Sequence, residues 1–130
     1  MLFRSYYGLF TQLWTQFPST VDATGHVDMW FIPVAAKSVI ISDWPLNAGS
    51  TQDTICDTTA ADMASRGWTV TRVPAFLVGG VHYTYTNATI CNNVVMVPSY
   101  TNATVAPYNA QALAAWQAAC PGKKIGRAHV

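Results

Sequence analysis

The segment HVDMWFIPVAAKSVIISDW, residues 26–44, constrains the fold more than any other stretch of the chain. It divides near Ala36 into two runs, residues 26–35 and 37–44, which are rich in β-branched and aromatic side chains. Such side chains fit the pleated, half-buried surface of a sheet. We therefore expect two adjacent strands here, and they begin a longer pattern.

A helix and a third strand are expected after this pair. Apolar residues recur at helical spacing over residues 51–66, with candidate caps among Thr51 to Asp53 and with Gly67 ending the helix. Residues 68–77 are again rich in β-branched residues and predict a strand. The first half of the chain thus has the order ββαβ.

The second half begins the same order again. Residues 83–91 and 94–97 predict a hairpin around Asn92 and Asn93, because asparagine tolerates the positive φ of a tight reversal. A helix is expected over residues 108–119, with a proline at its start and a Pro-Gly pair at its end. The sequence therefore predicts an α/β fold of about one and a half ββαβ modules.

Composition excludes several classes of protein. The chain has 130 residues, of which 51% are hydrophobic and only 10% are charged. No apolar run reaches the roughly 18 residues that a membrane-spanning helix needs, so we expect no membrane partner. The formal net charge is +1 and no basic stripe is present, which argues against a nucleic-acid partner.

The two ends of the chain resemble translated adapter sequence. The residues MLFRS, 1–5, and IGRAHV, 125–130, are what the two strands of a common sequencing adapter would encode. We therefore expect both ends to be non-native, which leaves residues 6–124 as the biological part of a longer protein.

A histidine and an aspartate, His26 and Asp28, lie two residues apart in the first expected strand. In a strand they would share one face with Trp30, because side chains alternate between faces. A carboxylate binds a guanidinium through two charge-assisted hydrogen bonds, and an imidazole transfers protons near neutral pH. The pair is therefore a candidate site for a guanidinium, with Trp30 as a candidate wall, although a solvated strand end would give the same pattern.

The motif GHVDMW is followed about sixty residues later by YTNATICNNVVMVP, residues 85–98, and then by ACPGKKI, residues 119–125. In this order and spacing the chain resembles the bacterial-type peptidylarginine deiminases of the pentein, or guanidino-group-modifying, superfamily. The resemblance implies a partial five-bladed α/β propeller built from ββαβ modules. It also favours a secreted or cell-surface parent protein.

The resemblance implies catalytic roles for three residues. Asp28 would hold the substrate guanidinium, His26 would transfer protons, and Asn87 would orient groups within the site. The implied reaction converts peptidyl arginine to citrulline and ammonia through a thiouronium intermediate on a cysteine. An arginine-containing peptide or protein is thus the implied partner, and no cofactor or metal is expected.

The nucleophilic cysteine of the family is not found in this chain. It follows a histidine in the family, and no His-Cys pair occurs here. We expect Cys56 and Cys120 to be small core residues, while Cys91 would lie roughly 13 Å from Asn87 along a strand. This chain alone is therefore expected to be inactive. His82, after a double glycine, is expected in an exposed loop.

Two other functions fit the same residues. Agmatine deiminases are related penteins that carry a similar His-x-Asp pair, but in them an Arg-Phe follows a few residues later, whereas residues 29–33 here contain no arginine. A non-catalytic arginine-binding module is the alternative outside enzymes.

Overall fold

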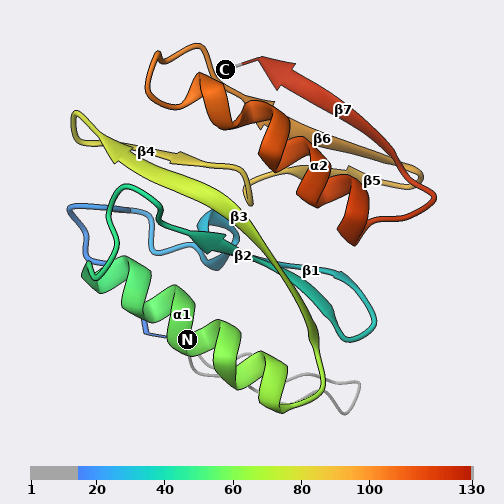
Figure 1. The fold of residues 1–130 in the computed structure, drawn as a ribbon, viewed down its shortest axis with the longest axis horizontal. Coiled ribbons are helices and arrows are strands. Elements are labelled where there is room, and N and C mark those ends of the chain that lie inside the picture. Colours follow the sequence, from blue (N-terminus) through green and yellow to red (C-terminus); the bar gives the residue numbers. More distant parts are fainter. Residues whose placement is uncertain (1–14, 130) are drawn as a thin grey trace.

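The first of two sheets contains four strands. The computed structural model describes residues 15–129 (Figure 1). In the first sheet the strand order is β1-β2-β3-β4. Its elements are β1 (Phe31–Ala35), β2 (Ser38–Asp43), helix α1 (Thr51–Ser65), β3 (Thr69–Val78) and β4 (Val81–Thr84).

The second sheet contains three strands in the order β5-β6-β7. Its elements are β5 (Thr89–Cys91), β6 (Val94–Ser99), the short 3₁₀ helix η2 (Ala106–Tyr108), helix α2 (Asn109–Ala119) and β7 (Lys124–His129). No helix within residues 15–129 has both the length and the apolar character needed to cross a membrane.

Both sheets are built in the same way. An antiparallel pair, β1–β2 or β5–β6, is followed by a helix and then by a strand that pairs in parallel, β3 or β7. The predicted α/β fold with repeated ββαβ modules is therefore confirmed. Residues 125–129 belong to β7. The second module therefore ends in a parallel strand, as the first module does with β3. The proposed non-native origin of these residues concerns their coding sequence and stays a prediction.

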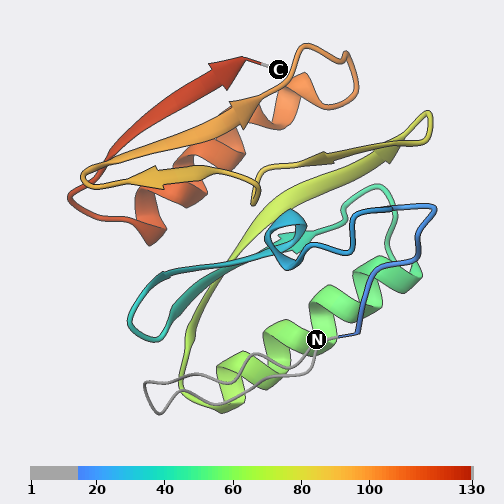
Figure 2. The ribbon, with the colours of Figure 1, turned by 180° about the vertical axis from the view of Figure 1, so that it is seen from behind.

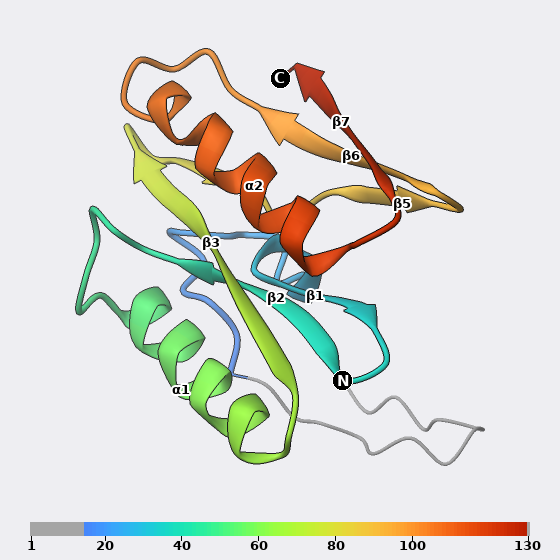
Figure 3. The same cartoon turned by 45° about the vertical axis from the view of Figure 1, so that its right-hand side comes forward.

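Helices cover the first sheet on both faces, as Figures 1 and 3 show. In β2, Val39 and Ile41 pack in the cluster beneath α1, whereas Ile40 packs with Val73 in the cluster around α2. All four side chains are fully buried. A strand buried on both faces is continuously apolar rather than alternating, which explains the run Val-Ile-Ile in the segment that opens the fold.

The predicted strand over residues 26–35 is wrong in its first half. Strand β1 begins at Phe31, and Val27–Met29 form the 3₁₀ helix η1. The carbonyls of His26 and Val27 accept the amides of the residues three positions later, at 3.3 and 3.1 Å. Local hydrogen bonds of this kind compete with strand pairing, so His26 and Asp28 do not share a strand face with Trp30.

The other differences from the prediction are at turns. Helix α1 is capped by Ser50, whose hydroxyl accepts the Asp53 amide at 3.3 Å, rather than by a residue within 51–53. The predicted strand over residues 83–91 is two strands, β4 and β5. The Asn92 and Asn93 reversal is confirmed, with Asn92 at φ +50°.

Candidate active site

The turn that carries His26 and Asp28 is exposed and is held by hydrogen bonds from the residues before it. The Asp22 carboxylate accepts the Thr24 amide at 3.0 Å and the Thr24 hydroxyl at 2.7 Å. The Thr24 hydroxyl in turn accepts the His26 amide at 3.2 Å. Asp22 is only 6% exposed. A buried carboxylate therefore fixes the backbone at which η1 begins.

Asn87 lies beside this turn although it is far away in sequence. Its amide Nδ2 is 3.4 Å from the Sδ of Met29, the residue that follows Asp28. The Thr84 hydroxyl donates to the Met29 carbonyl at 2.7 Å. Figure 2 shows the end of β4 above the short helix η1. The structure thus brings the segment with Asn87 against the segment with His26 and Asp28, and all three side chains are exposed.

An open hollow of about 510 Å³ adjoins Asn87. It is lined by Met29, the four residues of β4, Asn87 and residues 100–102. The Tyr100 hydroxyl fixes one wall, because it donates to the Thr84 carbonyl at 2.8 Å and accepts the Thr84 amide at 3.2 Å. No Asp, Glu, Lys or Arg side chain is among these lining residues. The lining of the hollow therefore has no charged side chain, apart from the imidazole of His82 when it is protonated.

Trp30 is placed differently from the prediction. Its side chain is 3% exposed and stacks on Phe17 with ring centroids 5.3 Å apart. Trp30 was expected to contact substrate because it would share a strand face with His26 and Asp28. These three residues do not lie in one strand, so that expectation is not supported. Trp30 instead packs in the core beneath the turn that carries Asp28.

His82 is not an exposed loop histidine. It lies in β4, after the turn that Gly79 and Gly80 make at φ +59° and +79°. Its ring stacks on Trp44 at a centroid distance of 5.1 Å, and within the part of the chain that the structure describes neither ring nitrogen has a hydrogen-bond partner. Burial lowers the pKa of His82 to about 4, although the Asp22 carboxylate acts in the opposite direction. The imidazole is therefore neutral at physiological pH.

Sequence comparison identifies the family. The model of the Porphyromonas-type peptidyl-arginine deiminase family matches residues 1–130. The chain belongs to this family. No curated protein sequence matches it.

Solved structures related to this peptidyl-arginine deiminase family member share its fold. A Porphyromonas gingivalis protein assigned as an arginine deiminase superposes with a TM-score of 0.62 at 19% identity, over 83% of this chain and 34% of that one. Agmatine deiminases give similar values. The Campylobacter jejuni enzyme with substrate bound has a TM-score of 0.66 at 15% identity, over 86% of this chain and 34% of its own. The Enterococcus faecalis enzyme has a TM-score of 0.65 at 19% identity, over 85% and 37%.

This family member therefore has the pentein fold, and it spans about a third of the length of these solved chains. The ββαβ modules correspond to part of the propeller.

The cysteines of this deiminase-family chain differ in their surroundings. Cys56 is fully buried, and burial raises the pKa of its thiol to about 12. Burial also raises the pKa of Cys120. A nucleophilic cysteine needs a thiolate at neutral pH, so both thiols are inert core groups, as the sequence predicts. Cys91 is exposed and lies in β5.

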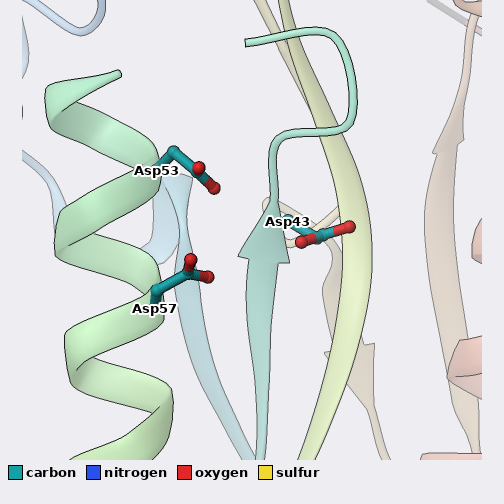
Figure 4. A group of neighbouring side chains, drawn as sticks. All are labelled: Asp43, Asp53 and Asp57. Carbon is teal, nitrogen blue, oxygen red and sulfur yellow. The ribbon is translucent and has the colours of Figure 1, made fainter. Parts of the chain in front are cut away.

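Three carboxylates meet between α1 and the end of β2. Asp43, Asp53 and Asp57 have oxygens within 4.8 Å of one another and point toward a common space (Figure 4). The guanidinium of Arg72 is 2.8 Å from Asp57 and 3.3 Å from Asp43. Asp53 also accepts the Gly49 amide at 2.7 Å. Each of the three carboxylates thus has a partner within the protein, and the cluster is an ion-pair and hydrogen-bond network.

Sequence reasoning missed the residues that hold the site in place. Asp22 and Thr24 are two such residues, and the spacing Asp-x-Thr just before a glycine is typical of a side chain that hydrogen-bonds its own backbone two residues on. That signal was present in the sequence. Thr84 and Tyr100 gave no signal, because their hydrogen-bond partners are 55 and 16 residues away.

Proposed function

We propose that this chain contributes His26, Asp28 and Asn87 to the active site of a larger protein that hydrolyses the guanidinium of peptidyl arginine to citrulline and ammonia. The observation that carries the proposal is the contact between Asn87 and Met29. It joins two segments that each hold a guanidine-binding or orienting group, at an exposed surface.

The proposed chemistry has two steps. A cysteine thiolate attacks the guanidinium carbon and ammonia leaves with a proton, which forms a thiouronium. Water then replaces the sulfur and gives citrulline. Asp28 would hold two guanidinium nitrogens and orient the carbon for attack. His26, on an exposed turn, would protonate the leaving ammonia and then accept a proton from water.

The nucleophile would come from outside the residues described. Cys56 and Cys120 are buried thiols with raised pKa values, and Cys91 lies on β5 rather than on the turn. We therefore expect the purified 130-residue chain to release no ammonia from peptidyl arginine. The buried Trp30 would support the turn from beneath, and Asn87 would hydrogen-bond within the site.

The test uses the full-length protein. Ammonia release is measured from a blocked arginine peptide, free arginine and agmatine, side by side. We expect the peptide to have the highest kcat/KM, and the substitutions Asp28→Asn and His26→Gln each to lower it by about 100-fold or more. Turnover of agmatine alone would instead favour an agmatine deiminase. Binding of peptidyl arginine without turnover would favour a non-catalytic arginine-binding module.

A matched control separates catalysis from folding. Asp62 lies on the exposed part of α1 and pairs only with Arg66, at 3.1 Å. The substitution Asp62→Asn makes the same chemical change as Asp28→Asn, and it should leave kcat/KM unchanged. Equal losses from both substitutions would contradict a catalytic role for Asp28.

A further inference from the structure

Among residues 15–129, no strand covers one edge of β4. It is the last strand in the order β1-β2-β3-β4, and within these residues it pairs with β3 alone. An edge strand presents backbone N–H and C=O groups that another chain can pair with. Figures 1 and 2 show this edge facing the segment that follows β6.

Thr84 shows which backbone groups point outward. Its N–H donates to the Tyr100 hydroxyl and its C=O accepts from the same hydroxyl, so neither pairs with β3. The pairing register sets Thr84 opposite Ala75 and His82 opposite Leu77. In an antiparallel pair the outward-pointing backbone groups recur at every second residue. The N–H and C=O of His82 therefore face the same outer edge, where they have no equivalent of Tyr100.

The hollow beside Asn87 lies along this edge. All four residues of β4 line it, together with Asn87 and with Met29, the residue that follows Asp28. Its lining also includes Asn102, whose amide donates to the Tyr83 hydroxyl at 3.4 Å. The hollow thus lies between Asn87 of the proposed active site and the strand that carries the two backbone groups of His82.

The absence of charged Asp, Glu, Lys or Arg side chains in the lining of the hollow favours a peptide over agmatine as substrate. None of its lining residues carries a carboxylate, so the ammonium that agmatine carries at the end opposite its guanidinium would find no partner there. His82 is neutral at physiological pH, because burial lowers its pKa to about 4. A peptide backbone is also neutral, and it offers both a donor and an acceptor at each residue.

We infer that the free edge of β4 binds the backbone of the peptide substrate as an added strand, with the N–H and C=O of His82 as its partners. This inference rests on the proposed function and adds to it the part of the substrate that is recognised. Strand addition supplies affinity through main-chain hydrogen bonds, and pockets for alternate side chains supply specificity.

The first test changes the substrate and not the protein. Blocked tripeptides with a central arginine are prepared with each flanking amide N-methylated in turn, and kcat/KM is measured with the full-length protein. N-methylation removes one donor and keeps every side chain. We expect one position to lower kcat/KM by about 3- to 10-fold, mainly through KM, because one neutral hydrogen bond is lost. The other position serves as the control.

The second test changes the protein edge. The substitutions His82→Pro and His82→Ala both remove the imidazole, but only proline removes the backbone N–H. Proline is tolerated on an edge strand where the N–H points outward. We expect His82→Pro to have a kcat/KM for the unmethylated peptide about 3- to 10-fold below that of His82→Ala, because the N–H of residue 82 no longer donates to a peptide carbonyl. The preference for the unmethylated peptide depends on the carbonyl of residue 82 and should persist in both variants. Circular dichroism melts of both variants establish that they fold.

The outcomes separate this inference from the proposed function. Deimination of all peptides with equal kcat/KM would overturn strand addition at β4 and leave the deiminase function intact. This is also the result expected if another segment of the full-length protein covers the edge. No ammonia from any arginine compound would overturn both.

Discussion

The hydroxyl of Thr84 donates a 2.7 Å hydrogen bond to the carbonyl of Met29 and so ties β4 to the turn that carries Asp28. Thr84 is 2% exposed, and its hydroxyl also lies 2.8 Å from that of Thr86. Because both partners are buried or half-buried, their loss leaves polar groups without hydrogen bonds. Thr84 therefore helps to set the relative position of Asp28 and Asn87, together with the contact between Asn87 and Met29.

We expect Thr84→Val, which keeps the shape and removes the hydroxyl, to lower the free energy of unfolding by about 1–3 kcal/mol. The same change should lower kcat of the full-length protein, because the turn moves relative to Asn87. Urea unfolding and steady-state kinetics measure the two effects. The control is Thr84→Ser, which retains the hydroxyl and should retain most of the activity. Equal activity of the Val and Ser variants would contradict this role.

The Thr24 hydroxyl links Asp22 to His26, because it donates to the buried Asp22 carboxylate and accepts from the His26 amide. Since Thr24 is itself exposed, we expect Thr24→Val to change the melting temperature little. It should lower kcat by about 10-fold or more, because the imidazole is no longer oriented. Thr24→Ser keeps the hydroxyl and should restore kcat. Wild-type kcat in the Val variant would show that the hydrogen bond does not position His26.

The sequence predicted the features that depend on local chemistry. The Asn92 reversal is one, because a residue at φ +50° suits asparagine whatever surrounds it. The strand predicted over residues 37–44 is another, since its β-branched residues favour a sheet and β2 lies within this range. Both features depend on residues that are neighbours along the chain.

The features that the sequence did not predict depend on distant partners. The predicted strand over residues 83–91 breaks after Thr84 because Tyr85 is fully buried and its hydroxyl bonds Asn109 at 2.7 Å, 24 residues away. Likewise Trp30 packs on Phe17 rather than on the face of Asp28. No periodicity within either segment indicates these contacts.

The stability of the protein should depend on the protonation of His82. Burial lowers the pKa of its imidazole from 6.5 to about 4, so between these values the unfolded chain binds a proton that the folded chain does not. The contribution of the neutral imidazole to the free energy of unfolding is therefore fully present above about pH 6.5. It is lost as the pH decreases toward 4, and the loss is at most about 3 kcal/mol.

The substitution His82→Phe keeps an aromatic ring against Trp44 and removes the titrating group. We expect its melting temperature to fall less than that of the wild type between pH 7 and pH 4. All other titratable groups are the same in the two proteins, so the difference between the two curves reports on His82. Parallel curves would contradict the effect of burial.

Arg72 connects the acidic cluster on α1 to the end of β2. Its guanidinium lies 2.8 Å from Asp57 and 3.3 Å from Asp43, and it donates two hydrogen bonds, of 2.8 and 3.2 Å, to the Ser42 carbonyl. Its side chain is 30% exposed, whereas those of Asp43 and Asp57 are 49% and 58% exposed. Water screens ion pairs of this kind, so the bonds to the carbonyl contribute a substantial share of the stabilisation.

We expect Arg72→Met to lower the free energy of unfolding by about 1–2 kcal/mol in urea titrations. The matched control is Arg66→Met, because among the described residues Arg66 pairs with Asp62 alone, on the exposed face of α1, and its loss should cost less than about 0.5 kcal/mol.

Removal of Arg72 also leaves three carboxylates within 4.8 Å without their cation. Added NaCl should therefore stabilise the Arg72 variant more than the wild type, since salt screens the repulsion. Equal costs for the two substitutions, or an equal response to salt, would show that Arg72 does not hold α1 against β2.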